Sequence, residues 1–245
     1  MKPTSLFAST ALLLLALPAA AQAETSAPVA QRMPAEKPEL HYLDPADYLP
    51  QRVLALPPAR ESAAEAAELA EVKSTIAAAS AERRAQATWD ADHEDPTAFN
   101  AVLGRDLTKL PATWDLLVTV QDEAYALTGR AKEAFARMRP YSIDASVQTC
   151  TKEDPGKPAK SYPSGHAAVG YSVGWTLARL LPDYAPYILD RARDYAESRV
   201  ICGVHFRSDL EASHVLATLV AERMLADPRL ADKVAKARAE LAAAP

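Results

Sequence analysis

Three short groups of residues carry the side chains that could do chemistry in this sequence of 245 residues. The first is the run KEAFARMRP, in which Lys132 and Arg139 are seven residues apart. Seven residues make about two turns of a helix, so both cations project in nearly the same direction. Basic residues also commonly end a helix because they complement its dipole. Alone, this group therefore predicts only a pair of aligned cations.

The second group is the run SYPSGH, which ends at His166 directly before an apolar periodic segment. Pro163 suits the first position of a helix, and the free backbone N–H groups of the residues that follow it form a site for anions. Gly165 would let a ligand approach the backbone closely. Alone, the run also fits a plain helix N-cap with an incidental histidine.

The third group is the run SRVICGVHFRSD, in which His205 and Asp209 are four residues apart. This spacing allows the carboxylate to hold one ring nitrogen and leaves the other nitrogen free to react. Arg199 lies on an otherwise apolar helix stripe, where an unpaired charge would be very costly and a bound anion would compensate it. A structural His–Asp pair is the alternative for this dyad taken singly.

Together the three groups supply three cations, an anion-binding helix start and two histidines. Phosphoryl transfer uses these parts, because its catalysis consists mainly of positioning the phosphoryl group and neutralising the charge on its oxygens. The set already contains a nucleophile and an acid, so it requires no metal. The sequence therefore predicts a phosphoryl-transfer site that works without a cofactor.

The segments that must position these groups have the periodicity of helices. Apolar residues recur every three or four positions over 117–138, 169–180, 188–202 and 210–224, and no alternating strand pattern of useful length appears. The alanine- and glutamate-rich segment 62–89 predicts one further long helix. We therefore expect an all-α fold, a single helical bundle.

Composition and charge support this class and exclude others. The apolar fraction of 49% is enough for one sizeable core. Only 7 glycines stand against 19 prolines, and aromatic residues make up 7%, which argues against a sandwich or barrel with many glycine-rich turns. The formal charge of -5 removes the attraction that non-specific nucleic-acid binding needs, so nucleic acid is not an expected partner.

The first residues have the pattern of a cleaved secretory signal. Residues 1–23 carry Lys2, then an apolar run, then Ala21-Gln22-Ala23. The apolar run is only about a dozen residues long, whereas a membrane span needs about 20. We expect cleavage before Glu24, export to a bacterial periplasm and no stable membrane insertion.

The prolines of the next segment indicate how the rest of the chain is divided. We expect a proline-rich arm over 24–58 and a helical domain over 59–245, with four apolar side chains able to dock part of the arm: Tyr42, Tyr48, Leu54 and Leu56. In an oxidising compartment two cysteines usually bond to each other, which predicts a disulfide between Cys150 and Cys202. The acidic run 90–95 is typical of a solvated turn that caps the next helix, and a cation site is its alternative.

In their order and internal spacings, the three groups resemble the signature of the type-2 phosphatidic acid phosphatase and vanadium haloperoxidase superfamily. Within it the chain is most similar to the bacterial class A non-specific acid phosphatases, from about residue 43 to about residue 225. This similarity rests on the runs SYPSGH, SRVICGVH and ALPPARESAAEAAELAEV and on the surroundings of Cys150. It implies a helical core and supports the Cys150–Cys202 disulfide.

The resemblance also implies a role for each site residue. His205 would attack phosphorus to form a phosphohistidine, and Asp209 would fix its tautomer. His166 would protonate the leaving alcohol and then act as the base for the water that releases phosphate. The groups that would hold the phosphoryl oxygens are Lys132, Arg139, Ser164, Gly165 and Arg199.

Two departures from the class A pattern flank the expected pocket mouth and bear on substrate preference. Lys160 stands where glycine is usual, and Ala167 replaces the threonine that usually follows Pro-Ser-Gly-His.

Small phosphorylated molecules are the expected partners, and a homo-oligomer is possible. The alternatives are a lipid-phosphate or pyrophosphate phosphatase, a vanadate-dependent haloperoxidase, and a phosphate-binding protein with a relic site. No catalytic role falls to the other histidines, His41, His93 and His214.

Overall fold

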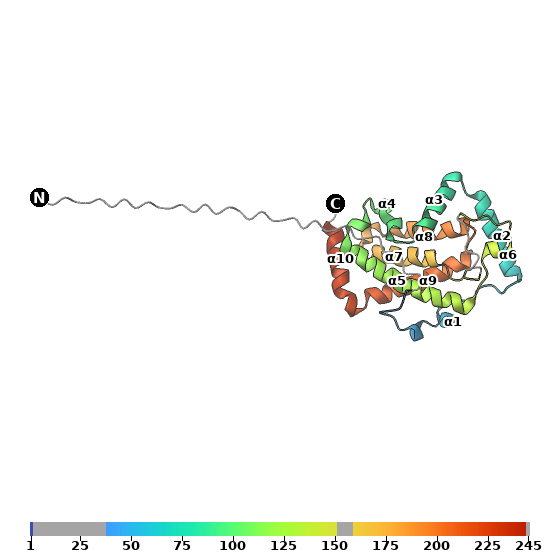
Figure 1. The fold of residues 1–245 in the computed structure, drawn as a ribbon, viewed down its shortest axis with the longest axis horizontal. Helices are drawn as coiled ribbons and strands as arrows, with labels where there is room; N and C mark the ends of the chain where they lie inside the picture. The colour runs from blue at the N-terminus through green and yellow to red at the C-terminus, as the bar shows by residue number, and fades with distance from the viewer. Residues whose placement is uncertain (2–37, 151–158, 244–245) are drawn as a thin grey trace.

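Helices account for all the regular structure in the described residues of the computed structural model (Figure 1). The structure describes residue 1 and residues 38–150 and 159–243. Apart from Met1, the expected signal peptide lies outside the described residues, as does the arm up to residue 37. Within the described ranges there is no strand, which confirms the all-α prediction. None of the helices in these ranges is long and apolar enough to span a membrane.

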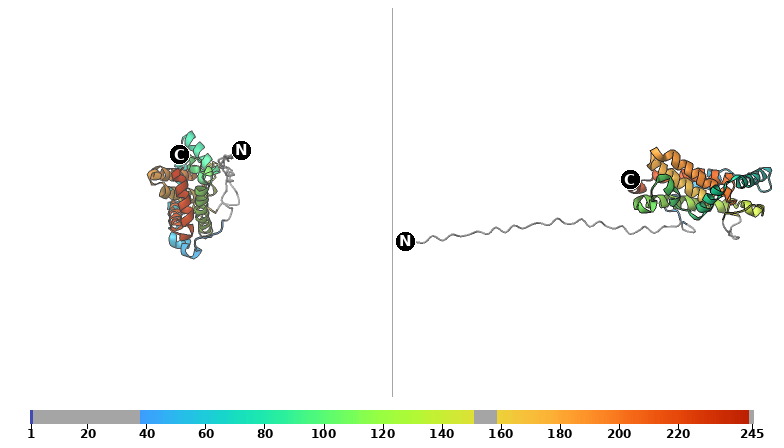
Figure 2. Two further views of the ribbon diagram at one scale, coloured as in Figure 1. Left: turned by 90° about the vertical axis from the view of Figure 1, so that its left-hand side faces the viewer. Right: turned by 90° about the horizontal axis from the view of Figure 1, so that it is seen from above.

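Four long helices run side by side and form the body of the bundle (Figure 1 and Figure 2). They are α5 (Pro111–Phe135), α7 (Gly165–Leu180), α8 (Ala185–Ile201) and α9 (Arg207–Leu225). Helix α7 packs against the other three, α2 (Ala63–Ala78) and α3 (Ala81–Asp92) lie against α8, and α10 (Ala231–Ala243) lies against α5. The short helices are α1 (Pro50–Val53), α4 (Asn100–Leu103) and α6 (Pro140–Ile143), and the 3-10 helices are Pro45–Tyr48, Pro96–Phe99, Leu107–Lys109, Pro182–Tyr184 and Pro228–Leu230.

Two glycines let α7 and α8 approach each other closely. A Cβ atom added at Gly170 would lie 2.6 Å from the Tyr195 ring, and one added at Gly174 would lie 2.9 Å from Ala192 Cβ. Real Cβ atoms essentially never come so near to other heavy atoms. The short distance between α7 and α8 therefore depends on the absence of side chains at both positions.

The prediction of one long helix over 62–89 is wrong, because this segment forms α2 and α3 as separate helices. The chain is extended at Ala79, with φ −69° and ψ 130°. Ser80 then caps α3 by accepting the backbone N–H of Arg83. Arg83 in turn donates to Ser198 Oγ on α8 at 2.9 Å. The serine cap and this packing on α8 override the high helix propensity of the junction.

Part of the arm docks on the bundle. Tyr48 and Leu54 are buried, whereas Leu56 remains 77% exposed and does not dock. The buried carboxylate of Glu123 on α5 accepts three backbone N–H groups from residues 41–43, at 2.6 to 3.2 Å. The described part of the arm is therefore fixed to α5 by both apolar burial and a buried acceptor.

The structure joins Cys150 to Cys202, as the sequence predicts. The bond ties the segment after α6 to the C-terminal end of α8, across a sequence separation of 52 residues. Because the bond restricts the unfolded chain, we expect the double variant Cys150→Ser/Cys202→Ser to lose about 4 kcal/mol of unfolding free energy. Denaturant titration of the oxidised protein and the variant measures this loss. Equal unfolding midpoints for the two proteins would contradict the prediction.

Candidate active site

His205 and Asp209 meet at the start of α9, with side chains 2% and 0% exposed. Oδ2 of Asp209 lies 3.2 Å from His205 Nδ1, and it also accepts the Phe206 backbone N–H at 2.8 Å and the Ser161 hydroxyl at 2.6 Å. A carboxylate at Nδ1 favours the tautomer that carries its proton there. The spacing of four residues thus produces the expected contact and leaves the lone pair on Nε2.

Nε2 of His205 faces a cation. Nη1 of Arg139 lies 3.2 Å from it and donates to the Val204 carbonyl at 3.1 Å. Burial lowers the pKa of His205 well below its ordinary value, and the nearby charges of Arg139, Lys132 and Arg199 lower it further. This lowered pKa favours the neutral imidazole, which is the state that a nucleophile needs.

The prediction that Lys132 and Arg139 project from one helix is wrong, because α5 ends at Phe135 and Arg139 is the N-cap of α6. The other two predicted cations come from α5 and α8. Lys132 on α5 donates to the Lys160 carbonyl at 2.6 Å, and burial together with Arg139 lowers the pKa of Lys132 well below its ordinary value. Arg199 lies in the last turn of α8 and is buried. Both act electrostatically on the ring of His205. The structure thus gathers the three cations around one imidazole.

The SYPSGH loop is tied to the first turns of α9. The Ser164 backbone N–H donates to the Asp209 carbonyl at 3.2 Å, and Ser213 Oγ donates to the Ser164 carbonyl at 2.8 Å. The prediction that Pro163 takes the first helical position is wrong, because Ser164 is the N-cap of α7 and the helix begins at Gly165. A Cβ atom added at Gly165 would lie 3.2 Å from the Tyr125 ring. Packing against this side chain is a reason for glycine here that the sequence did not indicate.

His166 lies in the first turn of α7, between two acceptors from the segment around the end of α3. Oε1 of Glu94 lies 2.9 Å from Nδ1, and the Ala91 carbonyl lies 3.0 Å from Nε2. These two acceptors fix the orientation of the imidazole ring. Burial opposes the ionisation of Glu94, but the charges of His166, Arg199 and Lys132 outweigh it and hold the pKa of this carboxyl below its ordinary value.

The acidic run 90–95 is mainly structural. Asp95 caps the 3-10 helix Pro96–Phe99, as the sequence predicts. The prediction of a solvated turn holds for Asp92, which is exposed, and is wrong for Asp90 and Asp95, which are buried. A cation site does not form there either: within residues 38–150 and 159–243, no group of three or more His, Cys, Asp or Glu side chains could hold a metal ion.

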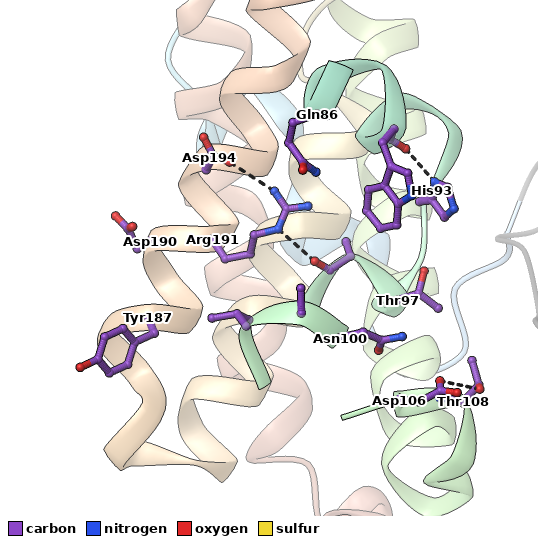
Figure 3. A pocket seen from close by; sticks show the side chains of 14 residues that line it. Gln86, His93, Thr97, Asn100, Asp106, Thr108, Tyr187, Asp190, Arg191 and Asp194 are labelled. Carbon is purple, nitrogen blue, oxygen red and sulfur yellow. Dashed lines mark hydrogen bonds and ion pairs between the residues drawn. The ribbon is translucent and has the colours of Figure 1, made fainter. Parts of the chain in front are cut away.

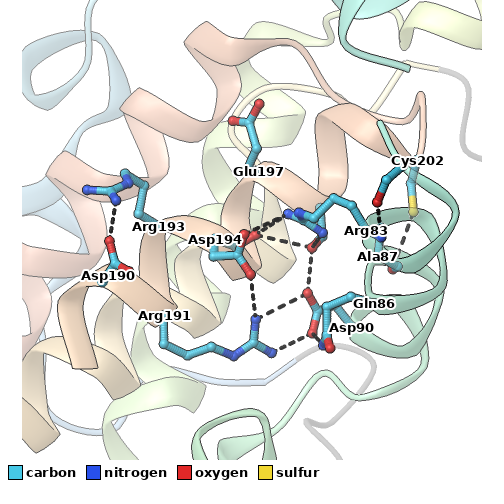
Figure 4. A network of polar contacts seen from close by, with 12 residues as sticks. Arg83, Gln86, Ala87, Asp90, Asp190, Arg191, Arg193, Asp194, Glu197 and Cys202 are labelled. Carbon is cyan, nitrogen blue, oxygen red and sulfur yellow. Dashed lines mark hydrogen bonds and ion pairs between the residues drawn. The ribbon is translucent and has the colours of Figure 1, made fainter. Parts of the chain in front are cut away.

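A polar network centred on Asp90 fixes α3 to α8 (Figure 4). Asp90 pairs with Arg191 and accepts the hydroxyl of Ser198, and Arg83 donates to both Ser198 Oγ and the Asp194 carbonyl. Ser198 directly precedes Arg199 in the chain. The network therefore aligns the end of α8 with the segment that contacts His166.

A pocket of about 970 Å³ lies between α3, α4 and α8 (Figure 3). Trp89 and His93 stack at its edge, with ring centroids 3.8 Å apart. Arg191 also lines the pocket, and its guanidinium lies over the Tyr195 ring. The Tyr195 ring also stacks with the ring of His166. None of the site residues predicted from the sequence lines this pocket. It is therefore distinct from the candidate active site.

Three residues of the site were not singled out as site residues from the sequence: Glu94, Arg137 and Ser161. Arg137 Nη1 donates to Asp209 Oδ1 at 2.8 Å, and Ser161 donates to the other carboxylate oxygen. Both lie inside the runs KEAFARMRP and SYPSGH. Their position inside these runs was a signal for a site role. It was not decisive, because the spacing within a run does not reveal which of its remaining polar side chains turn toward the site.

Comparison with solved structures supports the fold. The structure resembles that of a transmembrane PAP2-type phosphatidylglycerolphosphate phosphatase from Bacillus subtilis, with a TM-score of 0.50 and 21% sequence identity. The likeness covers 67% of this chain and 86% of that one. At this identity the similarity concerns the helical architecture.

Comparison of sequences identifies the family. The model of the PAP2 superfamily matches residues 113–229. The chain is 35% identical to an acid phosphatase of Zymomonas mobilis over 69% of this chain and 66% of the relative. It is 34% identical to a non-specific acid phosphatase of Providencia stuartii over 66% of this chain and 68% of the relative. The chain thus spans about two thirds of the length of these relatives, and it belongs to the PAP2 superfamily and, within it, to the bacterial acid phosphatases.

Proposed function

We propose that the protein is an exported acid phosphatase that hydrolyses small phosphomonoesters to an alcohol and inorganic phosphate, through a phosphohistidine and without a metal. The observation that carries this proposal is the buried ring of His205, with Asp209 at Nδ1 and Arg139 facing Nε2. Export rests on the signal pattern of residues 1–23. Amino-terminal sequencing of the exported protein should begin at Glu24.

The proposed reaction has two steps. Nε2 of His205 attacks phosphorus, a nitrogen–phosphorus bond forms as the ester bond breaks, and the leaving oxygen takes a proton from His166. Water then attacks phosphorus and gives a proton to His166, and the nitrogen–phosphorus bond breaks to release inorganic phosphate. The three cations neutralise the phosphoryl oxygens in both steps.

The free protein holds His166 ready for this role. Glu94 and the Ala91 carbonyl lie against the two ring nitrogens and fix the orientation of the ring before substrate binds. Proton transfer therefore requires the leaving oxygen to displace one of the two acceptors. The leaving oxygen of the bound substrate would then take the place of that acceptor beside the His166 ring.

Hydrolysis of p-nitrophenyl phosphate by the purified mature protein tests the proposal. The lowered pKa of His205 favours its neutral ring. We therefore expect kcat/KM for an alkyl phosphate, whose leaving alcohol needs a proton, to hold or rise as the pH falls from about 7 to about 5, the range in which a histidine acid gains its proton. We expect the activity to persist in excess chelator. Absence of hydrolysis, a steady decline of kcat/KM over this pH range, or loss on chelation with recovery on adding a divalent cation would each contradict the proposal.

Glu94→Gln should weaken the acid without removing it. The amide keeps the shape of the side chain but removes the negative charge 2.9 Å from His166 Nδ1. We expect kcat for an alkyl phosphate to fall about tenfold, because the ring loses the charged acceptor that orients its Nδ1–H. Steady-state hydrolysis of an alkyl phosphate over a pH series measures the loss. Asp92→Asn is the matched control, since Asp92 is an exposed carboxylate of the same run, and equal profiles for the two variants would contradict the prediction.

A further inference from the structure

Arg137 is a buried cation that the three-part signature does not assign. It directly follows Ala136, where the chain turns into the left-handed region at φ 46° after α5. Its Nη1 donates to Asp209 Oδ1 at 2.8 Å and to Ser208 Oγ at 2.7 Å, and its guanidinium lies 4.0 Å from the centre of the Phe206 ring. Arg137 therefore holds Asp209 by the oxygen opposite the one that faces His205.

Glu68 on α2 holds the other side of the same guanidinium. Its carboxylate pairs with Nη2 of Arg137, and the two side chains are 18% and 3% exposed. A charge pair so removed from water is costly to break, because the remaining partner stays buried without its counter-charge. One chain of contacts thus runs from Glu68 through Arg137 and Asp209 to His205.

The other charged contacts of α2 lead elsewhere. Glu71 pairs with Arg207, which also pairs with Glu197, and Lys73 pairs with Asp144. None of these pairs reaches the Asp209 carboxylate. Glu68 is therefore the α2 side chain that connects this helix to the proposed nucleophile His205. Helix α2 itself lies outside the region 113–229 that the family model matches.

We propose that Arg137 and Glu68 are positioning residues for the proposed nucleophile: Arg137 keeps Asp209 ionised and oriented toward His205, and Glu68 keeps Arg137 in place. This inference rests on the proposed phosphatase function. It adds no covalent step to the reaction. Its effect falls on the positive charge that the His205 ring gains on phosphorylation, because that charge needs an ionised Asp209 beside it.

The charges around Asp209 explain why Arg137 matters. Burial raises the pKa of the Asp209 carboxyl, and Arg137 is the strongest influence in the opposite direction, followed by the Ser161 hydroxyl, the Phe206 N–H and Lys132. The other ionisable groups of the site are His205 beside the carboxylate, Arg139 and Arg199 beyond that ring, His166 with Glu94, and Glu68 behind Arg137. When Arg137 is lost or displaced, Asp209 takes up a proton at higher pH, and the acidic limb of kcat moves to higher pH.

Four variants of the full mature chain test the inference: Glu68→Gln, Arg137→Lys, Arg137→Met and, as the matched control, Glu71→Gln. We measure kcat and KM for p-nitrophenyl phosphate across the acidic pH range, with thermal unfolding as the check on folding. Partner groups of this kind commonly contribute about 10- to 100-fold to activity. We expect kcat to fall about tenfold in Glu68→Gln and about 100-fold in Arg137→Met, with an intermediate loss in Arg137→Lys, which keeps the charge.

The signature of a positioning role is a loss in kcat with KM changed less than about twofold, together with an upward shift of the acidic limb. Glu71→Gln should retain the wild-type kcat and limb. The inference is overturned if Glu68→Gln and Glu71→Gln behave alike, or if Glu68→Gln only lowers the unfolding temperature and leaves the limb in place. Should Arg137→Met fail to fold, Glu68→Gln and Arg137→Lys decide the question. An inactive wild-type protein would instead refute the proposed function.

Discussion

His205→Ala should reduce kcat/KM for phosphate esters by at least about 1,000-fold, because it removes the atom that we propose attacks phosphorus. The three cations stay in place and can still bind the phosphoryl group, so weak hydrolysis by water should remain in the variant. KM should change much less than kcat. Steady-state hydrolysis of p-nitrophenyl phosphate measures the loss, and acid quenching of the wild-type reaction with labelled substrate measures the acid-labile phosphoenzyme that the variant cannot form.

The matched control for this variant is His214→Ala. His214 lies on α9, the helix that His205 precedes, but it is exposed and stacks on Tyr171. It should keep its activity. A His205→Ala protein that is folded and retains more than about a tenth of the wild-type kcat/KM would rule out the nucleophilic role of His205, because loss of a nucleophile costs orders of magnitude more.

His166→Ala should separate the two halves of the reaction by leaving group. An alkyl alcohol needs a proton as it departs, so kcat/KM for an alkyl phosphate should fall about 100- to 10,000-fold. A p-nitrophenolate departs without one, so kcat/KM for p-nitrophenyl phosphate should fall far less. Its kcat should nevertheless fall, because release of the phosphohistidine still lacks its base.

Rapid mixing tests this second prediction. With p-nitrophenyl phosphate the His166→Ala protein should release a burst of about one p-nitrophenolate per active site and then turn over slowly, because phosphorylation remains fast and water attack becomes rate-limiting. Equal losses of kcat/KM for the alkyl and the aromatic ester would show that His166 does not act as the acid. Comparison with Glu94→Gln adds a graded intermediate, since that variant keeps the histidine.

Local patterns in the chain predicted the helices well and their ends less well. The apolar stripe over 169–180 belongs to α7, which begins four residues earlier at Gly165, and the stripe over 117–138 belongs to α5, which ends at Phe135. A stripe marks only the face that becomes buried, whereas the ends are set by caps and by backbone turns such as that at Ala136. The end of α5 at Phe135 lets Arg137 turn toward Asp209.

The sequence by itself determined the helical class, the contact between His205 and Asp209, and the membership of the cations in one site. These features depend on spacing within one helix turn or on motifs that stand in order along the chain. Only the tertiary structure decided that Glu94 would hold His166 and that Glu68 and Arg137 would hold Asp209. The residues of those contacts are 72 positions apart for Glu94 and His166 and 69 for Glu68 and Arg137. Periodicity within a helix carries no information about which side chain of another helix will face it, because that choice follows from the packing of whole helices against one another.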